Sequence, residues 1–245
     1  MITIQGNRQI IKSAQLLESK ARNIYPHLST SRIKLRFNQD EQKPEYYQAL
    51  ANKITKSRKM IRNSHDFYSS VIYALQELKI GNCTEEAIFA ELLGRINGQN
   101  NIYSGSIFIN DVKKNKKMLN HAVAFITDKN IENGKDIFLK NKDAIIIDPW
   151  LNITDFAGSY YTKIMSTFRD IFKNLPKTNP FLNALAKAES KTPKEFNNYI
   201  REYDTPIKLS ITPFIDNTLK NTPVEYLREF FPELTIKNYK KINLT

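Results

Sequence analysis

The chain has 245 residues, with 37 Lys and Arg against 25 Asp and Glu, which gives a formal net charge of +12. A hydrophobic fraction of 41% excludes wholesale disorder, and the apolar runs are too short to cross a bilayer. One cysteine and three histidines exclude an internal disulfide and the common structural zinc sites, and seven glycines disfavour dinucleotide and phosphate-loop folds, so we expect no metal and no cofactor.

The positive charge is concentrated in residues 1–62, which hold 13 Lys and Arg against 4 Asp and Glu, a net charge of +9. This segment either meets an acidic partner or anionic lipid, or it consists of solvated helix faces. Arginines are not clustered among aromatic residues there, so we expect no nucleic-acid partner.

Three helices are predicted before residue 80. The first covers Asn7–Tyr25 and ends because the residue before a proline disfavours helix. The others cover Pro44–Ile61 and Ser64–Leu78. We therefore predict a basic helical N-terminal extension over 1–62 and a second unit over 63–245.

A new helix is predicted directly after a tight turn at Gly81. Asn82 is a good N-cap, Cys83 becomes the first helical residue, and Glu85 stands where a capping-box glutamate would. A glycine at position 94 or 98 can help to end this helix.

The period then changes from helical to extended. We predict strands over Ile102–Asn110, Leu119–Thr127 and Ala144–Asp148, with a long polar loop over Asp128–Asp143. The second strand is apolar on both faces around His121, which indicates a central position in the sheet.

The remainder of the chain returns mainly to helix. We predict helices over Ser159–Leu175 and Thr192–Tyr203, a strand over Leu209–Phe214, and a short helix opened by Thr222 that ends before Pro232. This order of elements predicts an α+β fold, with a short antiparallel sheet and helices at both ends.

Three residues stand at element junctions: Cys83 at a helix start, His121 early in a strand and Asp148 at the end of the next strand. A helix N-terminus favours a thiolate, and its free N–H groups can receive an oxyanion. An imidazole can take the thiol proton, and a carboxylate can fix the imidazole tautomer. These residue types therefore predict a nucleophile, a base and an orienting acid.

Each of these residues also has an ordinary interpretation. Cys83 could be a small buried hydrophobe and His121 a core histidine. The alternatives to Asp148 as the acid are Asp128, Asp143 and Asp155. Trp150 either shields the His–Asp hydrogen bond from water or anchors the core. Other residues fit a surface or packing role better than chemistry: His27, His65, Tyr46, Tyr47, Tyr160 and Tyr161.

Three short motifs carry a resemblance to a known superfamily. Residues 81–87 (GNCTEEA), 120–126 (NHAVAFI) and 145–150 (IIIDPW) resemble the papain-like and transglutaminase-like Cys-His-Asp superfamily, and are most similar to its bacterial effector proteases and glutamine deamidases. The resemblance implies a papain-like core in which the helix bearing Cys83 packs on a sheet bearing His121 and Asp148. It implies that residues 63–245 form the catalytic domain, with a helical C-terminal part.

The resemblance implies a thiol hydrolase acting on a protein amide, and we favour glutamine deamidation of a host-cell protein. A cysteine protease with the same triad and a non-enzymatic basic interaction module stay open as alternatives. The first residues show no Sec-type signal peptide, and the Lys-, Asn- and Ile-rich composition is typical of an AT-rich bacterial genome. We therefore expect a bacterial cytoplasmic protein that a dedicated secretion system delivers into the host cell.

Overall fold

The computed structural model describes residues 4–24, 56, 83–111, 116–131, 137–139, 142–174, 208–214, 224–230 and 232–244. The predicted helix Ser64–Leu78, the predicted helix Thr192–Tyr203 and all of Pro44–Ile61 except Lys56 lie outside these residues. So do His27, His65, Tyr46 and Tyr47.

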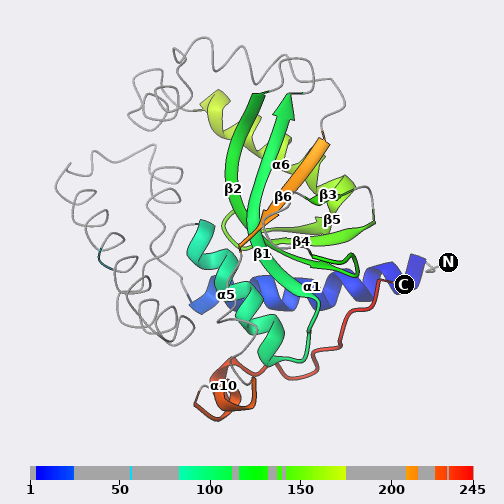
Figure 1. Cartoon of the computed structure of the whole chain (residues 1–245), viewed down its shortest axis with the longest axis vertical. Helices are drawn as coiled ribbons and strands as arrows, with labels where there is room; N and C mark the ends of the chain where they lie inside the picture. The colour runs from blue at the N-terminus through cyan, green and yellow to red at the C-terminus, as the bar shows by residue number, and fades with distance from the viewer. Residues whose placement is uncertain are drawn as a thin grey trace.

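The described residues form one antiparallel sheet of six strands in the order β3-β6-β1-β2-β4-β5 (Figure 1). The strands are β1 Ile102–Asp111, β2 Lys116–Thr127, β3 Ile137–Leu139, β4 Ala144–Asp148, β5 Ile153–Phe156 and β6 Lys208–Pro213. β2 lies between β1 and β4, so its predicted central position is confirmed. β4 has the predicted bounds, as expected for a fully buried run of β-branched residues.

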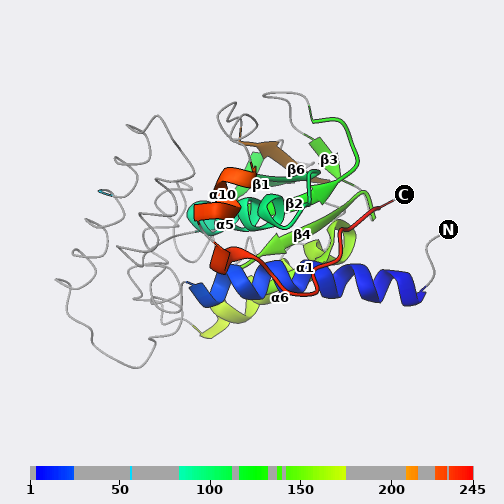
Figure 2. The ribbon, with the colours of Figure 1, turned by 90° about the horizontal axis from the view of Figure 1, so that it is seen from below.

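Helices pack around this sheet, and Figures 1 and 2 show α1 lying beside α5 and next to β4. The described helices are α1 Ile4–Ile24, α5 Cys83–Ile96, α6 Ala157–Asn174 and α10 Val224–Phe230, with a short 3-10 turn η1 at Pro232–Leu234. α5 packs on β1 and β2, whereas α6 packs on β5 and β4. Together with the sheet these helices establish the predicted α+β class.

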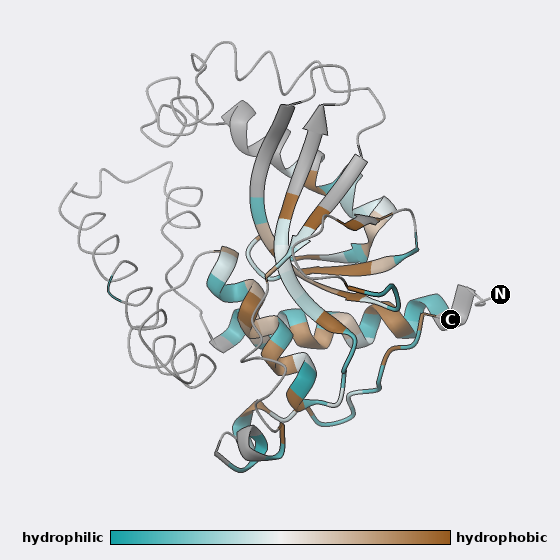
Figure 3. Cartoon of the chain, viewed as in Figure 1, coloured by the Kyte–Doolittle hydropathy of each residue, from teal (hydrophilic) through white to brown (hydrophobic). Residues whose placement is uncertain are grey.

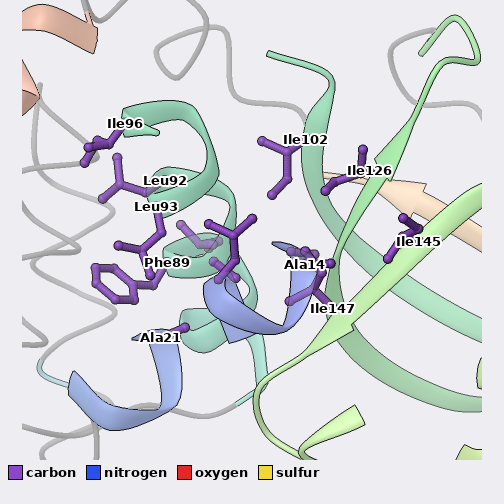
Figure 4. Close-up of a cluster of buried hydrophobic side chains, with 14 of the residues drawn as sticks. Ala14, Ala21, Phe89, Leu92, Leu93, Ile96, Ile102, Ile126, Ile145 and Ile147 are labelled. Carbon is purple, nitrogen blue, oxygen red and sulfur yellow. The ribbon is translucent and has the colours of Figure 1, made fainter. Parts of the chain in front are cut away.

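One hydrophobic cluster joins α1, α5, β2 and β4. Ala14 and Leu17 of α1 are fully buried in it together with Phe89 of α5 and Ile147 of β4. Figure 4 shows side chains of these elements gathered in one place, and Figure 3 shows hydrophobic residues on the same helices and strands. α1 is therefore part of the core. The predicted boundary between residues 62 and 63 lies outside the described residues, and the division into two units stays a prediction.

The start and the end of α5 both follow from its sequence. Glu85 and Glu86 occupy its first turn and Arg95 its last, which matches the helix dipole. At the C-terminal end Gly98 has a φ of 88°, and the N–H of Gln99 donates to the carbonyl of Gly94. This is a Schellman ending, which needs a left-handed residue that glycine supplies without strain.

A segment over residues 232–244 closes over the turn that joins α5 to β1. The Gln99 amide accepts hydrogen bonds from the N–H of Ile242 and the hydroxyl of Tyr239, and donates to the carbonyl of Ile242. The Asn97 side chain likewise donates to the carbonyl of Leu234 and accepts from the N–H of Ile236. Leu234 and Ile242 are themselves buried in the core cluster.

Several predicted boundaries need correction. The polar loop expected over Asp128–Asp143 contains β3, which forms because β6 pairs with it. β5 was not predicted. It follows a turn in which Asn152 has a φ of 60°, and β5 pairs with β4. The predicted strand Leu209–Phe214 is confirmed as β6, shifted by one residue. The first helix begins at Ile4 rather than Asn7.

Candidate functional site

The three junction residues come from three adjacent elements. Cys83 is the first residue of α5, His121 lies within β2, and Asp148 is the last residue of β4. The register joins β2 to β4 only over Ala124–Thr127. His121 therefore lies beyond this paired segment, and there it meets the first residue of α5.

His121 and Asp148 form a buried hydrogen-bonded pair. The ring Nε2 and the carboxylate Oδ2 are 2.8 Å apart, and the two residues are 4% and 0% exposed. Because a carboxylate only accepts hydrogen bonds, Nε2 carries the hydrogen and donates it. This fixes the ring so that Nδ1 is the nitrogen left for another partner.

That other partner is Cys83, whose sulfur hydrogen-bonds with the His121 ring and with the backbone of Ala122. Burial on its own would raise the pKa of the Cys83 thiol. The hydrogen bond and charge of His121, with the Ala122 backbone, outweigh burial and lower the pKa below its usual value, although the Asp148 charge opposes them. The helix N-terminus favours the thiolate in the same direction.

The imidazole is affected in the opposite sense. Burial alone would lower the pKa of His121, but the charge and hydrogen bond of Asp148, followed by those of Cys83, raise it to about 10. A lowered thiol pKa beside a raised imidazole pKa favours the thiolate–imidazolium form of the pair. As a whole residue, Cys83 is half-buried.

Asp148 is held by two further donors. The backbone N–H of Leu151 donates to Oδ1 over 3.0 Å, and the hydroxyl of Tyr160 donates to Oδ2 over 2.8 Å. Ile145 and Ile147 face the core cluster, so alternation along β4 places Asp148 on the opposite face, where Tyr160 of α6 reaches it. The Asp148 carboxylate therefore accepts three hydrogen bonds, from His121, Leu151 and Tyr160.

Trp150 lies against the His121 ring, with ring centroids 5.1 Å apart and planes inclined by 55°. Only 8% of Trp150 is exposed. The indole therefore covers one side of the histidine, as the shielding interpretation expects, and it is at the same time a buried packing residue.

The three rival carboxylates have other partners. Asp143 pairs with Lys129 over 2.6 Å and Asp155 with Lys163 over 2.7 Å. Asp128 accepts hydrogen bonds from Asn101 and from the backbone of Leu244. Among the described residues, Asp148 is the carboxylate that contacts His121.

Sequence reasoning missed the role of Tyr160. Its helical spacing to Ile164 correctly indicates that it packs inward, and both residues are fully buried. The sequence carries no signal for the partner of its hydroxyl, because α6 meets Asp148 only through the packing of α6 on β4 and β5. Within the described ranges, no group of three or more His, Cys, Asp and Glu side chains could hold a metal ion.

Comparisons of the chain with protein-family models, with curated proteins and with solved structures each find no match. No helix in the described part of the chain is both long and apolar enough to cross a membrane.

Proposed function

We propose that the protein is a cysteine-dependent amide hydrolase with a papain-like core, which deamidates glutamine side chains of a protein substrate. The observation that supports this proposal is the connected chain of contacts from Cys83 through His121 to Asp148, with a thiol pKa lowered by the imidazole. The resemblance of the three motifs to effector deamidases and proteases adds the substrate class.

In the proposed reaction, the Cys83 thiolate attacks the carbonyl carbon of the substrate amide, and an oxyanion forms. The oxyanion accepts hydrogen bonds from free N–H groups in the first turn of α5. The His121 imidazolium gives its Nδ1 proton to the amide nitrogen, so that ammonia leaves and a thioester remains.

Water then resolves the thioester. The neutral His121 takes a proton from the water at Nδ1, and the resulting hydroxide adds to the thioester carbon. Collapse expels the Cys83 thiolate and leaves a glutamate. Throughout this cycle Asp148 holds Nε2–H and stabilises the charged form of the ring. Overall, one amide and one water give one carboxylate and one ammonium ion.

The proposed setting is a host cell that receives the protein from a bacterium through a dedicated secretion system. It rests on the resemblance and on the composition. Recognition of an acidic partner or anionic lipid by residues 1–62 stays a prediction, since only 4–24 and 56 of that segment are described.

The first test compares the wild type with Cys83→Ala in a host-cell lysate. A deamidase converts Gln to Glu in an intact protein and releases ammonia, whereas a protease creates new chain ends. We expect Gln-to-Glu conversions in peptide maps of the wild-type sample only. Loss of the nucleophile should reduce the rate by about 10⁴-fold or more, since oxyanion stabilisation alone cannot replace covalent attack.

Chain ends that require Cys83 would instead identify a protease. Two results together would contradict the enzyme proposal and support the non-enzymatic interaction module. The lysates treated with wild type and with Cys83→Ala would be identical, and Cys83 would not react rapidly with iodoacetamide near neutral pH. Lys129→Ala is a suitable control, because Lys129 pairs with Asp143 away from the site.

A further inference from the structure

We infer that Tyr160 is a positioning residue of the site: its hydroxyl fixes the Asp148 carboxylate so that Oδ2 receives the His121 Nε2–H. The inference deepens the proposed function and rests on it for the catalytic meaning of the triad. The arrangement of Tyr160, Asp148 and His121 itself is observed.

The geometry leaves the carboxylate little freedom. Leu151 donates to one oxygen and Tyr160 to the other, so the plane of the Asp148 carboxylate is held from both ends. Oδ2 is shared by the Tyr160 hydroxyl and by His121, each at 2.8 Å. Without the hydroxyl, rotation about the side-chain bonds could turn Oδ2 away from the imidazole, because the Leu151 N–H would then be the only described donor besides His121 itself that holds the group.

Burial makes the hydroxyl hard to replace. Tyr160 and Asp148 are both fully buried, so bulk water does not reach the carboxylate to supply a donor. Burial first, and then the Asp148 charge and hydrogen bond, raise the pKa of Tyr160 well above its usual value. The hydroxyl therefore keeps its proton at every pH at which the site operates, and it always acts as a donor.

Among the residues that the structure describes, few charged groups act on His121 and Tyr160. The groups that act on His121 are Asp148 of β4 and Cys83 of α5, and the same two act on Tyr160 of α6. From α1, which also packs against β4, the buried acid Glu18 is paired with Arg22 of its own helix. Removal of the Tyr160 hydroxyl should therefore change the pKa values of His121 and Cys83.

The test uses Tyr160→Phe, which removes the hydroxyl and keeps the ring. Cys83 is the sole cysteine, so iodoacetamide alkylation followed against pH reports its pKa alone. NMR of ¹⁵N-labelled histidine reports the pKa of His121. A looser Asp148 should raise the Cys83 pKa and lower the His121 pKa, each by about one pH unit, the equivalent of one hydrogen bond to a charged group.

If Tyr160 had a packing role alone, Tyr160→Phe would lower stability without changing these two pKa values. Tyr161→Phe is the matched control, because it removes a hydroxyl from the next residue of α6, which is half-buried and not a donor to Asp148. We expect the control to keep both values. In a glutamine-peptide assay, Tyr160→Phe should lower kcat about tenfold with KM unchanged.

Superimposable profiles for Tyr160→Phe and wild type, or shifts in the opposite direction, would overturn the inference. If that variant fails to fold, wild-type NMR takes its place. The His121 Nε2–H proton and the Tyr160 hydroxyl proton should show a mutual NOE, and absence of the NOE from an assigned Nε2–H would overturn the inference. If the wild-type protein has a lowered Cys83 pKa but no hydrolase activity, the proposed function is contradicted, whereas the positioning role of Tyr160 is not.

Discussion

Burial and the His121 ring shift the pKa of Cys83 in opposite directions. Burial alone would raise the pKa of the thiol and leave it unreactive, as is usual for a lone buried cysteine. The His121 ring reverses this outcome because it is itself charged, and it is charged because Asp148 outweighs the cost of burying an imidazolium. The state of the sulfur therefore depends on a carboxylate that does not touch it.

This dependence predicts a bell-shaped pH profile for kcat/KM. Activity should rise as pH passes through the lowered pKa of Cys83, because the thiolate forms there. It should fall near pH 10, where His121 loses the proton that the leaving nitrogen needs. Initial rates of ammonia release across this range measure both limbs. An acid limb at the ordinary thiol pKa would contradict the thiolate–imidazolium pair.

At the scale of elements, α1 shows how a basic segment and a core element coincide. Its exposed side carries Arg8 and Lys12, whereas Ala14, Leu17 and Ala21 are fully buried against α5 and the sheet. Part of the basic charge of residues 1–62 therefore lies on the outer face of a helix whose inner face completes the core.

Two adjacent leucines of α1 offer a direct test of this packing. Leu17 is fully buried, whereas Leu16 is 40% exposed. Leu17→Ala should lower the free energy of unfolding by about 2–5 kcal/mol, through lost burial and the cavity left behind. Leu16→Ala should change it by about 0.5 kcal/mol or less. Urea titrations of both variants give the comparison, and equal effects would show that α1 is not packed as described.

The sequence predicted the elements whose signals are local. Ile145–Ile147 alone is sufficient to identify β4, and Cys83 follows a recognisable helix start. β3 has only three residues, and its strand conformation depends on β6, about 70 residues further along the chain. The site was predictable in its three junction residues for the same reason. The Tyr160 hydroxyl was not, because its partner is set by the packing of α6 on the sheet.

At the scale of the whole molecule, the turn after α5 joins distant parts of the chain. Gln99 is fully buried, and its amide is hydrogen-bonded to Tyr239 and Ile242 as well as to Asn101 beside it. Arg228 donates to the carbonyl of Ile96 at the same helix end. The helix that carries Cys83 is therefore anchored at its far end by residues beyond position 225.

Gln99→Ala should loosen this closure. The N–H and carbonyl of Ile242 would lose their partners in a buried place, which costs about 1–3 kcal/mol of the free energy of unfolding. Hydrogen exchange of the Ile242 amide should accelerate in this variant. Lys240→Ala, a change at an exposed position of the same segment, should leave that exchange unchanged. Unaltered exchange in Gln99→Ala would show that the segment is held by its side chains alone.

The closure also determines when the core can be completed during synthesis. Ala14 enters the core from one side of the sequence, and Leu234 and Ile242 enter the same core from the other. A nascent chain therefore carries an incomplete core until Ile242 has left the ribosome, and until then the helix bearing the thiol lacks its anchor. The packing of the helix that bears Cys83 is consequently completed only after residues 232–242 have been translated.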